Sequence, residues 1–196
     1  MAVDGSQLGQ MLQRLDAFFV EQGAPVAGAL RPGLGPAELD AAEAELGFPL
    51  PHEVRDWYAW HDGVEETEAG GVRLPNLTLL SSMRGALDAR QTFLNPGPLI
   101  DAYQVYQSTW LPITQFEAET LVVDCAGAAT GRHASAPVYV IDYADEWEQT
   151  MPSITAMVQL WITAIDDGYW RYDRDSGSWA HTFGQLPLEY RVSGVM

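Results

Sequence analysis

The chain has 196 residues, and its 10 basic residues, all of them arginine, stand against 27 acidic ones, which gives a formal net charge of −17. This charge excludes binding to the phosphate backbone of nucleic acids through bulk attraction, and an anionic membrane surface would repel it. Disorder is excluded as well, because 47% of the residues are hydrophobic and 11% are aromatic. The length fits a single domain over residues 1–196.

The sequence predicts a soluble, cytoplasmic protein. Its first residues lack the basic region and continuous apolar run of a secretory signal. No stretch approaches the roughly 18 consecutive apolar residues that a membrane-spanning helix needs. The single cysteine, Cys125, excludes an intrachain disulfide, which fits a reducing compartment.

The N-terminal third is predicted to be helical. Apolar residues recur there at spacings of three and four, and glycine and proline mark the ends of each stretch. These signals predict helices from Leu8 to Gly23, from Pro36 to Gly47 and from Pro51 to Gly63. Residues 24–35, rich in glycine and proline, are expected to form a linker.

The rest of the chain favours strands, with two further helices. Short runs rich in β-branched residues predict strands at 72–74, 77–80, 110–113, 120–124 and 138–141. Helical spacing predicts helices over 83–94, with Ser81 or Ser82 as N-cap, and from Pro152 to 166–168. A turn sequence between two aromatic stretches predicts a terminal hairpin over 169–182. Because strands and helices do not alternate regularly, the expected fold class is α+β, with helices packed on a mostly antiparallel sheet.

The order of several short motifs resembles the SUKH superfamily, in particular the branch of fungal cell-wall-synthesis regulators (Smi/Knr type) and many bacterial proteins. The motifs are the stretches 38–43 (ELDAAE), 46–51 (LGFPLP), 57–58 (WY), 61–63 (HDG), 110–113 (WLPI) and 121–124 (LVVD). The late apolar helix and the tyrosine-rich hairpin at 169–179 match the usual ending of the family. The resemblance covers about residues 25–180, so the helix within 1–23 is an addition to this SUKH-like core.

The resemblance implies a non-enzymatic interaction domain with a SUKH-like α+β fold and no cofactor. In bacteria such domains are often immunity proteins, which bind and block a cognate toxin, frequently a nuclease. In fungi they serve as scaffolds in cell-wall regulation.

Residues that could carry chemistry each have a plainer interpretation. Cys125 follows an aspartate, which raises the pKa of a thiol, whereas a nucleophilic thiol needs a lowered pKa. The four histidines form no short-spaced pair of the kind that metal sites show. Asp173 and Asp175 begin a pattern like a calcium loop, but Gly177 and Gly184 replace two of its ligands, which favours a hairpin turn. No catalytic residue, metal or cofactor is therefore expected.

The residues expected to bind a partner lie in two acidic segments, 62–68 and 142–148, and in loop-like sequence that carries Tyr103, Tyr106 and Trp147. A solvated loop is the plainer alternative for each acidic segment. Exposed tyrosine and tryptophan often anchor protein interfaces, although packing of these aromatic residues within their own loops is an equal alternative. The predicted partner-binding residues are Asp62, Glu65, Glu66, Glu68, Tyr103, Tyr106, Asp142, Asp145, Glu146, Trp147 and Glu148.

Two functions from different classes follow. The first is a binding protein that neutralises a basic protein partner, for example a toxin nuclease, whose phosphate-binding groove would attract an acidic inhibitor. The second is a cytosolic scaffold or small-ligand sensor, in which the long aromatic loop 95–110 lines a pocket. An enzyme using Cys125 or the carboxylates of 142–148 ranks last. The sequence does not fix the oligomeric state.

Overall fold

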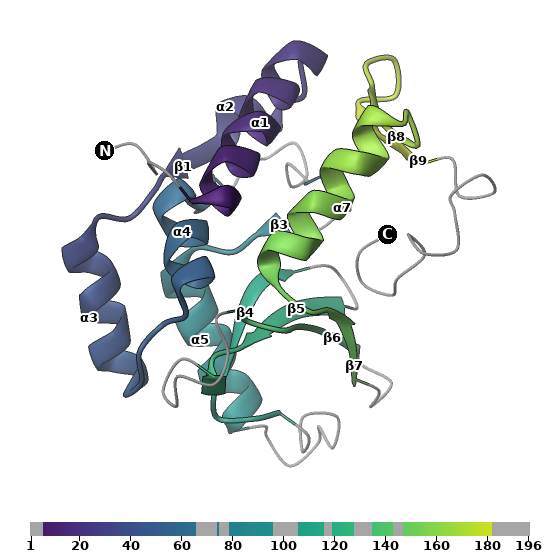
Figure 1. The fold of residues 1–196 in the computed structure, drawn as a ribbon. Helices are drawn as coiled ribbons and strands as arrows, with labels where there is room; N and C mark the ends of the chain where they lie inside the picture. Colours follow the sequence, from purple (N-terminus) through teal and green to yellow (C-terminus); the bar gives the residue numbers. More distant parts are fainter. Residues whose placement is uncertain are drawn as a thin grey trace.

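A computed structural model describes residues 6–65, 74, 79–95, 106–115, 119–127, 135–142 and 147–181. Its centre is a five-stranded sheet in which every neighbouring pair is antiparallel, and helices pack against it (Figure 1). The predicted α+β fold class is confirmed. No helix in the described part of the chain is both long enough and apolar enough to cross a membrane.

The first two predicted helices are confirmed. Helix α1, Gln7–Gln22, begins at Ser6, whose hydroxyl oxygen accepts the N–H of Gly9 at 2.9 Å, and ends at Gly23 with φ +66°. Helix α3, Pro36–Leu46, begins with a proline, which has no N–H to leave unpaired in the first turn. The carboxylate of Glu38 accepts the N–H of Gly35 at 2.8 Å and closes its N-terminus.

The prediction of the third helix is wrong at its C-terminal end. Helix α4, His52–Trp60, stops before His61, and strand β2, His61–Val64, follows. Strand β2 pairs antiparallel with β1, Leu30–Pro32. Both β1 and the short helix α2, Val26–Ala29, lie in the expected linker. Gly63 is therefore a strand residue: its φ is +82°, and a Cβ there would lie 2.6 Å from the amide nitrogen of Ser82. Only glycine fits this close approach.

The five strands of the central sheet run in the order β3-β4-β5-β6-β7. Their bounds are Leu79–Leu80, Trp110–Gln115, Glu119–Asp124, Val138–Asp142 and Trp147–Met151. Strands at 110–113, 120–124 and 138–141 are thus confirmed, each with small extensions. Strand β7 is not predicted from the sequence, in which the acidic residues of 142–148 indicate a solvated loop. The predicted strand at 72–74 and the first residues of 77–80 lie outside the described residues, apart from Leu74.

The remaining elements follow the prediction closely. Helix α5, Met83–Leu94, is capped by Ser82, and α7, Ile154–Asp166, is capped by Ser153. Each serine hydroxyl oxygen accepts a backbone N–H three residues further on, at 3.1 Å and 3.0 Å. Strands β8, Trp170–Asp173, and β9, Ser178–His181, form the terminal hairpin.

Alternation along the strands separates two hydrophobic clusters on the two faces of the sheet. In β5, Leu121 and Val123 belong to the main core, whereas Val122, between them, belongs to a second cluster. The main core joins the sheet to α1, α4 and α7. The second cluster consists of Phe93, Tyr106, Trp110, Val122 and Ile141, and α5 is the one described helix that contributes to it.

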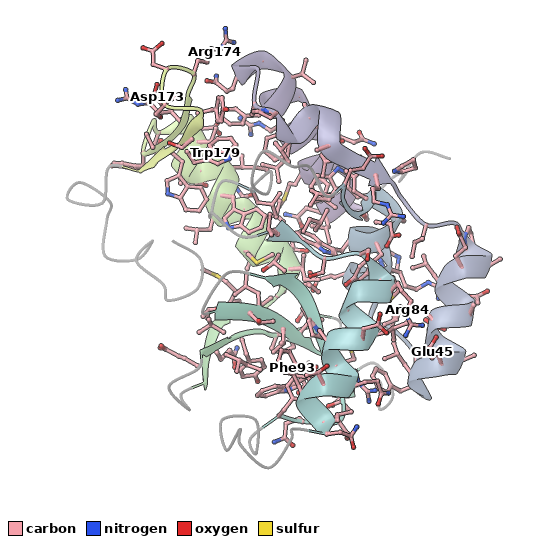
Figure 2. All side chains as sticks on the ribbon, turned by 180° about the vertical axis from the view of Figure 1, so that it is seen from behind. Glu45, Arg84, Phe93, Asp173, Arg174 and Trp179 are labelled. Atoms are coloured by element: carbon pink, nitrogen blue, oxygen red, sulfur yellow. The ribbon has the colours of Figure 1, made fainter. Side chains whose placement is uncertain are left out.

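Helix α1 is built into the main core. It lies beside α7 in Figure 1 and also packs against α4. Arg14 donates to both carboxylate oxygens of Asp166 on α7 at 2.7 Å. At the C-terminal end of α1, Arg174 of the hairpin donates to the carbonyl oxygens of Gln22 and Glu21 at 2.7 and 3.1 Å. Figure 2 shows Arg174 beside this helix.

Candidate protein-binding surface

The structure describes only part of the predicted partner-binding set. Glu66, Glu68, Tyr103, Asp145 and Glu146 lie outside the described residues. The backbone places Asp142 at the end of β6 and Trp147 at the start of β7. The side chains that can be located are those of Asp62, Glu65, Tyr106 and Glu148.

The side chain of Asp62 has a structural role. Its Oδ1 accepts the backbone N–H of Met83 at 2.6 Å, at the first residue of α5. A carboxylate at a helix N-terminus satisfies an unpaired N–H and interacts favourably with the helix dipole. Asp62 is half-buried in this position, and it links β2 to α5.

Glu65 and Glu148 are the exposed acidic members of the set. Glu65 follows β2, and its backbone N–H donates to the carbonyl oxygen of Ala29 at 2.8 Å. Its side chain is exposed to solvent. Glu148 lies in β7 opposite Val140 of β6. Among the described residues, no basic side chain forms an ion pair with either carboxylate.

Tyr106 is buried rather than exposed, so of the two alternatives for this residue the structure shows the packed one. Its side chain is 8% exposed, and its hydroxyl donates to the carbonyl oxygen of Trp110 at 2.8 Å. Burial is the main reason why the pKa of Tyr106 lies far above its usual range. To contact a partner, the side chain of Tyr106 would have to leave this cluster. Tyr106 is therefore a core residue and not an interface anchor.

A continuous row of aromatic rings links Tyr106 to the β6–β7 end of the sheet. The ring of Phe93 lies 5.0 Å from that of Tyr106, which meets Trp110 edge-on at 5.7 Å. Trp110 in turn stacks on Tyr139 at 5.0 Å. Tyr139 pairs with Gln149 of β7 and is half-buried, so the row ends near the surface. Figure 2 shows Phe93 at its α5 end.

The two acidic segments do not lie side by side in the part that the structure describes. Strand β2 packs beside β3 at one edge of the sheet, whereas β6 and β7 form the opposite edge. Asp62 and Glu65 are thus separated from Asp142 and Glu148 by the width of the sheet. The described acidic residues of these two segments therefore lie at opposite edges of the sheet and do not form one joint patch.

Sequence reasoning missed the residues that give the β7 surface its shape. Gln149 is exposed next to Glu148, and Tyr139 lies opposite it in β6. The sequence does contain a signal for strand β7. Trp147 and Thr150 are residue types that favour strands, and they follow the strand predicted at 138–141 after a short turn-like sequence. The high acidic content of 142–148 concealed it.

The residues that could carry chemistry have structural roles instead. The thiol of Cys125 is fully buried, and burial, followed by the charge of Asp124, raises its pKa far above the usual range. The hydroxyl of Thr109 and the N–H of Ala126 both donate to Asp124, at 2.9 Å. Among the described residues, no group of His, Cys, Asp and Glu could hold a metal ion.

The aspartates of the terminal hairpin form a turn, as predicted. The N–H of Asp175 donates to Asp173 at 3.0 Å, and the hydroxyl of Ser176 donates to the same carboxylate at 2.9 Å. These hydrogen bonds, that from Ser176 first, lower the pKa of Asp173. His61 lies at the boundary of the core, with Nδ1 2.7 Å from the carbonyl oxygen of Arg31 and Nε2 3.3 Å from Asp16.

Comparison with known families agrees with this geometry. The model of the SMI1 / KNR4 family (SUKH-1) matches residues 33–160, well over half of the chain. The match runs from the residues before α3 into α7, so it contains the whole central sheet, while α1 and the terminal hairpin lie outside it. No curated protein matches the chain significantly. The chain belongs to the SMI1 / KNR4 family (SUKH-1).

Proposed function

We propose that this SUKH-1 protein is a non-enzymatic binding protein that captures and blocks a basic protein partner, as an immunity protein blocks its toxin. The observation that carries the proposal is a net charge of −17 on a chain of this family. A toxin nuclease is the partner that suits this charge, because its active-site groove must be basic to bind phosphate. An acidic inhibitor would be steered towards such a groove by long-range attraction.

The use of the arginines supports the proposal. Arg14, Arg55 and Arg84 form ion pairs with neighbouring carboxylates, and Figure 2 shows Arg84 of α5 beside Glu45 of α3. Arg90 is buried and donates to the carbonyl oxygen of Ser108. Since these cations are engaged within the protein, they are not available to attract an anionic ligand.

The environment of Cys125 supports a role that is not enzymatic. A nucleophilic thiol needs a lowered pKa and access to a substrate, whereas this thiol is fully buried and its pKa is raised by that burial. A buried free thiol also suits the cytoplasm, which is the location that we propose.

The alternative role as a small-ligand sensor depended on the loop 95–110. Residues 96–105 lie outside the described part of the chain. The described end of this loop carries Tyr106 and leads to Trp110, and both side chains are buried in the second cluster. This packing favours the binding protein over the sensor as the function to test first.

The proposal is tested by measuring binding between the purified protein and each protein encoded beside its gene. We expect one basic neighbour to bind tightly. Its association rate should fall as sodium chloride rises from about 0.1 M to about 1 M, because the Debye length shrinks from about 10 Å to about 3 Å. If that partner is a nuclease, an equimolar amount of the protein should abolish cleavage.

Polyarginine serves as the control for unspecific attraction. A neighbour that binds no better than polyarginine, or the absence of any basic partner among the neighbours, would contradict the proposal.

A further inference from the structure

The outer edge of strand β7, Trp147–Met151, has no structural role among the contacts described so far. It is the last strand of the five-stranded sheet and pairs on its inner side with β6. In the part of the chain that the structure describes, no strand pairs with its outer side. Such an edge presents backbone N–H and C=O groups that can pair with a strand from another chain.

The opposite edge of the sheet is closed. Strand β3 has only two residues, Leu79–Leu80, and β2 packs beside it. The contact is tight, since Gly63 approaches the backbone of Ser82 and Asp62 accepts the N–H of Met83. Figure 1 shows β7 at the far side of the sheet from β3.

The side chains of β7 make its edge accessible and acidic. Glu148 and Gln149 are both exposed, and they pair with Val140 and Tyr139, which point to opposite faces of the sheet. Solvent therefore reaches the strand from both faces at these two residues. The carboxylate of Glu148 supplies a negative charge at the edge itself.

A bulge limits the part of β7 that can accept a strand. Tyr139 pairs with Gln149 and Val138 with Met151, so Thr150 is an extra residue on β7. Its hydroxyl donates to the carbonyl oxygen of Val138 at 3.3 Å. Because a bulge bends the strand and interrupts regular pairing, the usable edge is residues 147–149.

We propose that the basic partner docks by adding an extended, arginine- or lysine-rich segment as a further strand along residues 147–149 of β7. This inference rests on the proposed function and names its binding surface. Main-chain hydrogen bonds hold the added strand in register, and a basic side chain on the face of Glu148 pairs with that carboxylate. A second copy of this acidic chain is disfavoured, since it would bring like charges together across the new strand pair.

The test uses a defined probe, a peptide of about eight alternating arginine and valine residues, a usual strand length. A backbone-methylated version keeps every charge and loses the N–H donors. We expect the unmodified peptide to bind and to slow hydrogen exchange of the β7 amides. The methylated peptide should bind about tenfold more weakly and leave β7 unprotected.

A matched pair of variants separates this edge from general attraction. Glu148→Arg and Glu65→Arg change the net charge equally at exposed positions on opposite edges of the sheet. Glu148→Arg should weaken peptide binding about tenfold, because it places like charges together, whereas Glu65→Arg should have little effect. Equal binding of both peptides, protection away from β7, or equal losses in both variants would overturn the inference.

The same variants separate this inference from the proposed function. If the neighbouring-gene partner binds wild type tightly and Glu148→Arg equally well, docking at β7 is wrong and the proposed function stands. If no basic partner binds wild type, the proposed function is wrong, and the peptide still reports on the edge.

Discussion

At the scale of single residues, Glu53 is a buried carboxylate that joins three segments of the chain. It lies on α4 and is only 9% exposed. One oxygen accepts the N–H of Ala136 at 3.0 Å, and the other accepts the N–H of Thr155 at 3.1 Å together with the hydroxyl of that threonine. It thus connects α4, the segment before β6 and the first turn of α7. A buried carboxylate is tolerated here because backbone and side-chain donors surround it.

We expect Glu53→Ala to lower the free energy of unfolding by about 3 kcal/mol, because the buried N–H of Ala136 and the partly buried N–H of Thr155 both lose their acceptor. Glu53→Gln keeps one carbonyl oxygen and should cost less. Urea denaturation followed by circular dichroism measures both values. Glu21→Ala, at an exposed position on α1, is the control and should change stability by about 0.5 kcal/mol or less. A cost for Glu53→Ala as small as that of the control would contradict this role.

Residue-scale reasoning from sequence gave only part of the candidate surface. The acidic composition indicated where carboxylates are, and Glu65 and Glu148 are exposed. It could not show that Asp62 holds the start of α5, because Met83 is 21 residues away in the chain. Nor could it choose between the packed and exposed alternatives for Tyr106, which depend on the faces of β4 and β6.

At the scale of elements, the helices were predictable because local residues set their ends. Gly23, Pro36, Gly47 and Ser82 all lie at the helix ends where the sequence predicts a stop, a start or a cap. Strands β1 and β2 were missed because their pairing joins residues about 30 positions apart, and His61 continued the helical spacing of α4. Strand β7 was missed because an exposed edge strand has few apolar residues.

Helix α1, which lies outside the family match and contributes Leu8, Leu12, Leu15 and Phe19 to the main core, should depend on the terminal hairpin for part of its stability. Trp179 of β9 is 8% exposed and stacks on Phe18 at 5.9 Å, with Phe19 at 6.0 Å. Trp179→Ala should lower the free energy of unfolding by about 3 kcal/mol through lost packing and a cavity. It should also speed hydrogen exchange in the last turn of α1.

Asp175→Ala, in the exposed turn of the same hairpin, is the matched control, since only its backbone N–H forms a hydrogen bond there. Both variants are measured by urea denaturation and by hydrogen exchange at residues 19–23. Similar small losses for the two variants would show that the hairpin does not stabilise α1.

At the scale of the whole molecule, two electrostatic effects oppose each other as the pH falls. Repulsion among the excess carboxylates destabilises the folded state at pH 7 and declines towards the pI of about 4.3. Individual ion pairs and hydrogen bonds act the other way. Arg84 lowers the pKa of Asp88, and the hydroxyl of Ser176 is the main cause of the lowered pKa of Asp173. Carboxyl groups with lowered pKa values stabilise the fold above their unfolded pKa, about 3.9, and lose this contribution only as the pH falls through the folded value.

The melting temperature should therefore rise from pH 7 to about pH 5, where repulsion weakens while Asp88 and Asp173 remain ionised, and fall below about pH 3.9. Differential scanning fluorimetry at low salt measures this profile. In about 1 M sodium chloride the rise should disappear, because a Debye length of about 3 Å already screens the repulsion at pH 7. A melting temperature that falls between pH 7 and pH 5 at low salt would mean that the specific contacts of the carboxylates outweigh their mutual repulsion. The net charge would then be part of what holds the fold together, and its value for attracting a basic partner would come without a cost in stability.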